Sequence, residues 1–178
     1  MNFTPFLRHY ALNGRRYSED ERTWFARQPN LRQAIRLAAR AENRHGQRFH
    51  HQRRIRRGAL RAAESALLAA SSVISTAQSF PDLFTAIIST VGNIRYIGEL
   101  YCYDTAFRVG AFLGILPDAI YLHAGVREGA RALRIQHTGI SIPTSLLPRP
   151  LRHLPPHEAE DFLCIYKKQI IRSCGCGW

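Results

Sequence analysis

The residues of this sequence that could do chemistry are chiefly arginines, concentrated in one stretch of the chain. Eleven arginines fall between positions 27 and 61, against a single acidic residue, Glu42. Arginine recurs there at every fourth position, at Arg32, Arg36, Arg40, Arg44 and Arg48. On one α-helix this spacing lines up guanidinium groups along a face, and their repulsion costs helix stability unless an anion neutralises them. The pattern predicts contact with a polyanion; the alternative is a charged face that meets only water.

The charge of the whole chain points to the same class of partner. The 178 residues carry a formal net charge of +12. Residues 1–80 hold 15 arginines against 5 acids, a net charge of +10, whereas residues 81–178 hold 10 lysines and arginines against 8 acids. Nucleic acid is the commonest polyanion that such a surface binds, and we favour DNA over RNA. An acidic protein partner is the alternative.

Two further groups of arginines extend this prediction. The stretch RFHHQRRIRRGALR adds Arg53 and Arg54 to the run. Further along, Gly125 is followed by Arg127 and Arg131, one helical turn apart. A glycine and two arginines at a helix N-terminus could hold a phosphate. In the alternative interpretation Gly125 is a simple connector and Glu128 pairs with a neighbouring arginine.

The stretch IRYIGELYCYDTAFRVG, at positions 94–110, contains another candidate phosphate contact. An apolar helical pattern ends near Val91, and a new one begins after Ile97-Gly98. Over about residues 84–114 this arrangement resembles the helix-hairpin-helix DNA-binding element of DNA repair glycosylases. The resemblance implies that backbone N–H groups near Gly98 hold a DNA phosphate, with Arg95 and Tyr96 beside it.

The match to that element is partial. The usual turn has two glycines flanking one apolar residue, and Tyr96 occupies the first of those places. A packing corner between two helices is the alternative interpretation. The resemblance also suggests a base-excision enzyme, in which Asp118 would be the catalytic acid. The lysine of the bifunctional members is missing, however, because position 100 is Leu.

No other constellation indicates a reaction. The sequence has no G-x-S-x-G elbow and no Walker A motif. Asp104 and Arg108 have the spacing of an ordinary ion pair within a helix, and His123 is interpreted as a hydrogen-bonded core residue. Cys174-Gly-Cys176 lacks a second ligand pair at zinc-finger spacing, although His153 and His157 could in principle complete a site. We therefore expect no metal, no cofactor and free thiols, and we favour a binding protein over an enzyme.

The apolar residues recur mainly with helical periodicity, so helices must position the candidate site residues. Ser18 with Glu21, and Asn30 with Gln33, have the spacing of helix N-caps. Only residues 140–143 have strand character, and residues 138–156, with five prolines, predict a long surface loop. The expected helices cover about residues 3–11, 18–28, 30–45, 60–74, 81–91, 99–113, 117–123, 126–134 and 156–172.

The predicted fold class is therefore all-α, a compact multi-helix single domain spanning 1–178. It has an Arg-rich half at about 1–80 and a half with the hairpin and C-terminal helices at about 81–178. The start of the chain, MNFTPFLRHY, lacks the pattern of a secretion signal, and no apolar run approaches the length of a membrane span. We expect a cytoplasmic protein without a membrane partner, associated with the nucleoid if it binds DNA.

Overall fold

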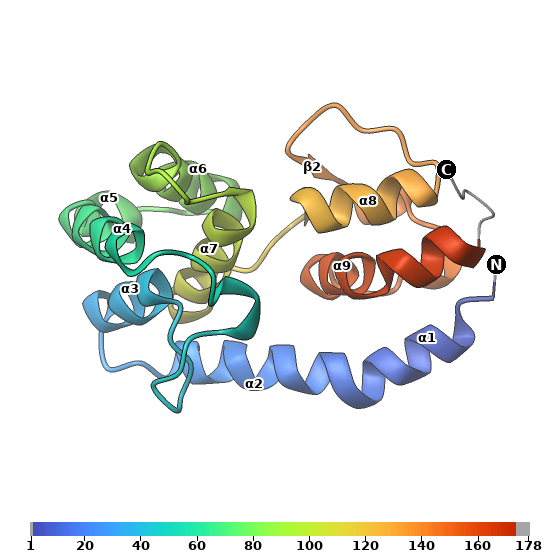
Figure 1. The fold of residues 1–178 in the computed structure, drawn as a ribbon, viewed down its shortest axis with the longest axis horizontal. Helices are drawn as coiled ribbons and strands as arrows, with labels where there is room; N and C mark the ends of the chain where they lie inside the picture. Colours follow the sequence, from blue (N-terminus) through green and yellow to red (C-terminus); the bar gives the residue numbers. More distant parts are fainter. Residues whose placement is uncertain (1, 174–178) are drawn as a thin grey trace. The chain divides into compact units, whose positions relative to one another are not determined.

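The chain folds almost entirely into helices, as the sequence predicts (Figure 1). The computed structural model describes residues 2–173. The α-helices are α1 (Thr4–His9), α2 (Arg15–Ala26), α3 (Leu31–Arg40), α4 (Arg57–Ala69), α5 (Ser71–Ser75), α6 (Phe80–Val91), α7 (Glu99–Leu113), α8 (Ala124–Ala132) and α9 (Pro156–Ser173). A π-helix, Tyr10–Gly14, joins α1 to α2, and short 3-10 helices lie at His50–Gln52, Thr144–Leu146 and Arg149–Leu151. Two short strands, β1 (Ile120–Tyr121) and β2 (Ser141–Ile142), complete the described elements.

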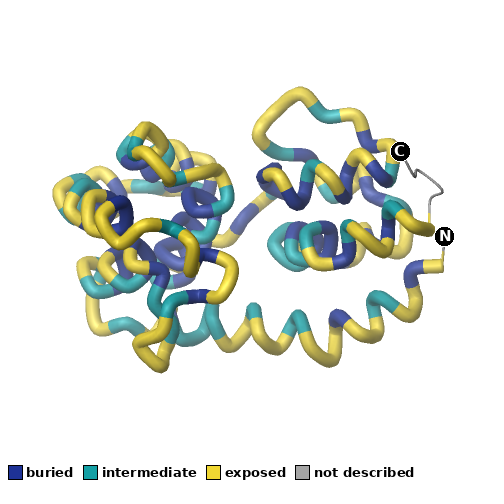
Figure 2. The backbone as a smooth tube through the Cα atoms, in the orientation of Figure 1, coloured by how far each residue is buried: buried dark blue, intermediate teal, exposed yellow. Residues whose placement is uncertain are grey.

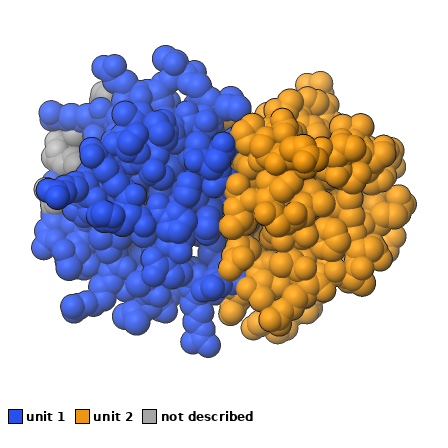
Figure 3. Space-filling model, turned by 180° about the vertical axis from the view of Figure 1, so that it is seen from behind, with its two compact units in different colours: residues 1–19, 117–178 blue, residues 20–116 orange. Residues whose placement is uncertain are grey.

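The residues form two compact units, coloured separately in Figure 3. Unit 1 contains residues 1–19 and 117–178, and unit 2 contains residues 20–116. The Arg-rich stretch and the hairpin-like turn both belong to unit 2. The two halves that we distinguished on either side of residue 80 therefore do not coincide with the two units. Folding as a single domain stays a prediction.

Unit 2 is built around α7. This helix packs against α3 and α6, and α3 in turn packs against α4. Most residues of α7 are buried, whereas in α2 only Phe25 is buried (Figure 2). The inner face of α6 includes Phe84, Ile87 and Val91; Ile88, whose spacing also predicts an inward position, is only partly buried. Apolar burial on this scale supplies the main driving force for the unit to fold.

The two N-caps predicted from sequence have opposite outcomes. Asn30 caps α3, since its side-chain Oδ1 accepts a hydrogen bond from the backbone N–H of Gln33 at 2.9 Å. Ser18, however, lies inside α2, because the chain is already helical from Thr4 onward. The predicted start of a helix at Ser18 is wrong. The Glu21 carboxylate, which we expected to complete that cap, instead accepts a hydrogen bond from Arg108.

Helix α3 ends at Arg40, several residues earlier than predicted. Ala41 takes a left-handed conformation, with φ of 55°, and the backbone N–H of Glu42 then bonds to Leu37 O at 3.0 Å. The chain turns back so that Glu42 forms a β-bridge with Arg48. Phe49, the residue that follows, is buried. The helix therefore ends where the chain turns back, and this turn is followed by a buried aromatic side chain.

The connection between α6 and α7, residues 92–98, is short, and the two helices pack together. Gly98 is the N-cap of α7, with extended backbone and no side-chain cap. Tyr96 has φ of 76°, the left-handed region that favours glycine. Whether this turn acts as a helix-hairpin-helix element stays a prediction.

Unit 1 pairs α8 with α9 beside a small sheet. The strand predicted at 140–143 exists, and β1 pairs with it antiparallel, Ile120 opposite Ile142 and Tyr121 opposite Ser141. The helix predicted at 117–123 is therefore wrong, because Ile120 and Tyr121 bury both side chains as a strand. The Pro-rich segment after β2 has only short 3-10 turns before α9, as its composition predicts.

No helix within residues 2–173 is both long enough and apolar enough to cross a bilayer.

Candidate nucleic-acid interface

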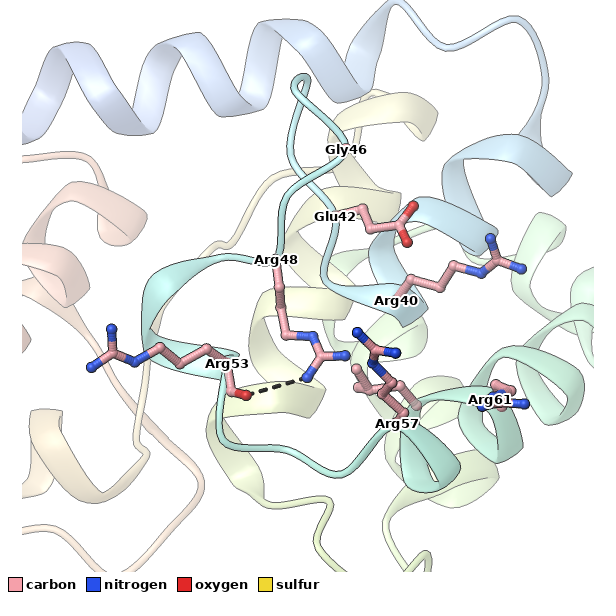
Figure 4. Close-up of a pocket in the computed structure, with 8 residues that line it drawn as sticks. Arg40, Glu42, Gly46, Arg48, Arg53, Arg57 and Arg61 are labelled. Atoms are coloured by element: carbon pink, nitrogen blue, oxygen red, sulfur yellow. Dashed lines mark hydrogen bonds between the residues drawn. The ribbon is translucent and has the colours of Figure 1, made fainter.

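Unit 2 has a pocket of about 650 Å³ where α3 ends and α4 begins. We call it the arginine pocket; it is lined by Arg40, Glu42, Gly46, Arg48, Arg53, Arg57, Leu60 and Arg61. Five of its eight lining residues are arginines and one is acidic, so the pocket is strongly cationic. In the view of Figure 4 the guanidinium groups of Arg48 and Arg57 are drawn next to each other, and those of Arg40 and Arg61 lie apart from them. The side chain of Arg53 points away from that group.

Hydrogen bonds from Arg48 shape the loop that forms one wall of the pocket. Its Nη1 donates to the carbonyl oxygens of Arg53 at 3.2 Å and Ile55 at 2.8 Å; the bond to Arg53 is the dashed line in Figure 4. Each bond satisfies a carbonyl of a segment without regular structure. Arg48 therefore holds the loop closed, which is a structural role that its position in the arginine row does not predict.

A polar network anchors the same loop to α7. Arg108 is 1% exposed, and its Nε donates to Glu21 Oε1 at 2.6 Å while its Nη1 donates to Gln52 Oε1 at 2.8 Å. The guanidinium carbon also lies 3.9 Å from the centre of the Phe49 ring. Asp104 Oδ2 lies 3.9 Å from Arg108 Nη2 and accepts a hydrogen bond from Gln52 Nε2 at 2.7 Å. The predicted pair of Asp104 and Arg108 is thus one edge of a larger buried network.

His51 joins this network at its exposed edge. Its Nε2 lies 2.8 Å from Asp104 Oδ2. Burial opposes protonation of the imidazole, but the hydrogen bond and the negative charge of Asp104 outweigh it, so the pKa of His51 is raised above its ordinary value of 6.5. Protonation of His51 therefore strengthens the attachment of the loop.

The α3 side of the pocket is neutralised by a residue from α4. The carboxylate of Glu64 accepts a hydrogen bond from Arg40 Nε at 2.7 Å and lies 3.5 Å from Arg36 Nε. The hydrogen bond to Glu64 is the main cause that raises the pKa of Arg40. Glu64 is outside the stretch of residues 27–61 in which we counted one acid, and the fold brings it to the arginines.

The α4 side carries cations without such a partner. Among the described residues no carboxylate forms an ion pair with Arg57 or Arg61. Arg57 is the first residue of α4, whose N-cap, Arg56, provides no side-chain hydrogen bond. Cations at a helix N-terminus oppose the helix dipole, and like charges four residues apart repel. An anion bound here would relieve both costs.

The four-residue row of arginines is broken in the structure. Arg44 and Arg48 lie beyond the end of α3, so only Arg32, Arg36 and Arg40 share its helix. Arg44 instead donates from Nε to His45 Nε2 at 3.1 Å in the turn that precedes the bridge. The predicted stripe over residues 32–48 is therefore wrong, because it required a helix that the left-handed Ala41 ends.

A second cationic cluster surrounds Tyr96. The guanidinium carbons of Arg56 and Arg95 lie 4.5 Å and 4.9 Å from the centre of its ring. Tyr96 is 43% exposed, and Gly98 has no atom within 4 Å of the place where a Cβ would stand. Arg54 is also exposed. These residues lie in unit 2 and present their groups to solvent.

The other predicted site residues belong to unit 1. Arg127 and Arg131 lie in α8, and Arg127 Nη1 donates to Gly139 O at 3.4 Å. Asp118 is exposed in a bend before β1 rather than in the first helical turn that we expected. Burial, and then the charge of Asp118, raises the pKa of Tyr121 to about 12. Cys174 and Cys176 are outside the described residues.

Sequence reasoning missed Arg57, Arg61 and Glu64 as parts of the site. A signal existed for the two arginines, because Arg53, Arg57 and Arg61 also recur at every fourth position. No signal in the sequence indicates that Glu64, on α4, pairs with the arginines of α3. Comparison of the chain with family models, with curated proteins and with solved structures finds no match.

Proposed function

We propose that unit 2 binds the phosphate backbone of nucleic acid at the arginine pocket, with Arg57 and Arg61 as the main contacts. The observation that carries this proposal is the concentration of five arginines around one pocket whose lining includes a single acid. Guanidinium groups bind phosphate oxygens through paired N–H donors, and a helix N-terminus adds further donors. The start of α4 offers both.

The fixed shape of the loop supports this assignment. Arg48 and the network of Arg108, Gln52 and Asp104 hold the loop in place through charged hydrogen bonds. A preorganised loop loses less conformational entropy on binding than a mobile one. The cations of the pocket are therefore positioned before the ligand arrives.

The Tyr96 cluster is proposed as a second contact on the same nucleic acid. Arg56 immediately precedes Arg57 in the chain and packs over the Tyr96 ring. In the resemblance to a helix-hairpin-helix element, Tyr96 stands where a glycine is usual, and its φ of 76° is a conformation that glycine favours. Gly98, two residues after Tyr96, has no atom within 4 Å of the position of a Cβ, which leaves room for a phosphate to approach the backbone.

Contacts of this kind do not read sequence. Phosphate contacts fix position and orientation, whereas base-edge contacts specify sequence. We therefore expect similar affinities for unrelated DNA duplexes of equal length. Base excision through Asp118 is not part of this proposal.

The experiment compares two double variants that lose the same charge. Arg57→Gln with Arg61→Gln removes two pocket arginines of α4 that form no ion pair with a described residue. Arg8→Gln with Arg16→Gln removes two exposed cations of unit 1. Fluorescence anisotropy with labelled duplexes at low salt should show affinity lowered at least about tenfold in the first variant and little changed in the second. Equal affinities of the two variants would contradict the proposal. If no duplex or single strand bound even the unaltered chain, an acidic protein partner would replace nucleic acid.

A further inference from the structure

Unit 1 brings together three side chains of metal-binding type that lie far apart in the sequence. These are His123, Glu160 and Cys164. One ligand atom from each, an imidazole nitrogen, a carboxylate oxygen and a sulfur, lies within 4.8 Å of the other two. His123 and Glu160 are buried, with 2% and 4% of their surface exposed, and Cys164 is partly exposed. The arginine pocket belongs to unit 2, so this cluster is independent of the proposed function.

Rigid elements position all three residues. Glu160 and Cys164 are four residues apart in α9, so their side chains share one face of the helix. His123 is the N-cap of α8, two residues after the end of the strand β1, with an extended backbone. The pairing of α8 with α9 therefore sets the separation of the ligands, as a metal site requires.

Glycines allow α8 to approach α9 this closely. A Cβ on Gly129 would lie 2.7 Å from Leu163 O, and a Cβ on Gly125 would lie 2.9 Å from Cys164 Sγ. The same Cβ on Gly125 would lie 3.5 Å from Cε1 of His123. Gly125, which we considered as part of a phosphate site, thus keeps the space between two of the three ligands free.

The donor set fits Zn²⁺. Zinc takes thiolate, imidazole and carboxylate ligands, and sites with three protein ligands leave a fourth position for water. The thiolate of Cys164 and the carboxylate of Glu160 together balance the two positive charges of the ion. Lys167 Nζ, which forms an ion pair with Glu128 at 3.2 Å, also lies 3.2 Å from the same Cβ position on Gly125.

We propose that His123, Glu160 and Cys164 bind one Zn²⁺ ion, with the fourth position open on the partly exposed side of Cys164. In the structure described here His123 Nε2 and Glu160 Oε1 are joined by a hydrogen bond of 2.5 Å. Two such ligands of a tetrahedral zinc ion are about 3.3 Å apart, given bonds of about 2.0–2.1 Å. Zinc therefore takes the place of the proton between Nε2 and Oε1 and separates the two atoms slightly. The neutral imidazole then carries its proton on Nδ1, and the proton of the Cys164 thiol passes to solvent.

The first test measures metal in the full-length chain, produced without a histidine tag. Elemental analysis after dialysis in chelator-free buffer should find one zinc ion per chain. Removal of zinc by a chelator should lower the melting temperature, and added Zn²⁺ should restore it, because the ion binds the folded state. A chain that holds no zinc, and whose melting temperature does not change with added Zn²⁺, would overturn the proposal.

The second test assigns the ligands by substitution. Glu160→Gln keeps the size of the side chain and a hydrogen bond to His123 but loses the negative charge; Cys164→Ser removes the sulfur. Each should weaken zinc affinity more than about 100-fold, since loss of outer-shell partners alone costs about 10- to 100-fold. Co²⁺ bound in place of zinc should give a thiolate charge-transfer absorption that disappears in Cys164→Ser. Circular dichroism of the metal-free variants checks that the helices are retained.

A matched control excludes the tail cysteines. The variant Cys174→Ser with Cys176→Ser removes two thiols outside the described residues and should keep both the zinc ion and the cobalt absorption. Loss of the metal in this control, with retention in Cys164→Ser and Glu160→Gln, would overturn the proposed site.

Discussion

Helices α3 and α4 carry arginines at the same four-residue spacing, yet their guanidinium groups have different surroundings. On α3, Arg36 and Arg40 share the carboxylate of Glu64. On α4, Arg57 and Arg61 form no ion pair with a described residue, and Arg57 is the first residue of the helix, where a cation is unfavourable. The difference comes from the packing of α4 against α3, which turns Glu64 toward α3. Equal spacing in sequence therefore gives a structural pair on one helix and a candidate binding surface on the other.

The buried Arg108 is the extreme case of a paired arginine, and its replacement should have the largest effect. Arg108→Met leaves Glu21, Gln52 and Asp104 without their common partner in a site where Arg108 is 1% exposed. Loss of one member of a buried ion pair costs about 3–5 kcal/mol. Urea unfolding should show this decrease, while Arg8→Met at an exposed position changes the unfolding midpoint little. A wild-type midpoint for Arg108→Met would show that the network does not hold the fold.

The paired arginines of α3 should affect stability more than binding. Arg36→Gln with Arg40→Gln leaves the carboxylate of Glu64 without a cation, and its side chain is only 12% exposed. We expect the free energy of unfolding to fall by about 1 kcal/mol, at the upper end for partly exposed pairs. Adding Glu64→Gln to this variant should restore most of the loss. If the triple variant is no more stable than the double, Glu64 is not the reason for the loss.

The α4 arginines should show the opposite behaviour. Arg57→Gln with Arg61→Gln removes a cation from the helix N-terminus and one repulsion between like charges. The melting temperature without ligand should rise, corresponding to a gain of about 0.5–1 kcal/mol, although the same variant binds nucleic acid more weakly. A fall in melting temperature would mean that these side chains stabilise the fold.

The smallest expected effect is the pH dependence of stability that arises from His51, in the loop between α3 and α4. The pKa of His51 is higher in the folded protein than its ordinary value of 6.5, so the folded state binds the proton more tightly. The resulting stabilisation is complete below pH 6.5 and is lost as the pH rises through the raised pKa. It should be small, because the side chain is 43% exposed and solvent screens its interaction with Asp104. The difference in unfolding free energy between wild type and His51→Gln should therefore shrink at alkaline pH; a constant difference would contradict this assignment.

The fold was predictable where local signals agree with packing. The N-cap at Asn30, the bounds of α7 and the strand at 140–143 follow from capping residues, periodicity and β-branched composition. The failures lie where a distant contact decides. Helix α3 stops at Arg40 because Ala41 turns the chain and Phe49 is buried, and residues 120–121 form a strand because residues 141–142 pair with them.

The site was predictable only in composition. The excess of arginine is visible in the sequence, but which arginines remain without a carboxylate depends on Glu64, Glu21 and Asp104, residues brought in by tertiary packing. Arg48, which we predicted from the four-residue spacing to contact nucleic acid, instead donates hydrogen bonds to backbone carbonyls. The cluster of His123 with Glu160 and Cys164 spans about forty positions of sequence and had no detectable spacing motif.

The most direct test of the contrast between the two helices is the salt dependence of duplex binding. Each phosphate that a cation neutralises contributes about 0.9 to the slope of log affinity against log salt concentration. Arg57→Gln with Arg61→Gln should lower the magnitude of that slope by about 1.8, since two such contacts are lost. Arg36→Gln with Arg40→Gln should lower it by no more than about one contact's contribution, because Glu64 balances one of those two charges. Equal slopes for the two variants would contradict the account.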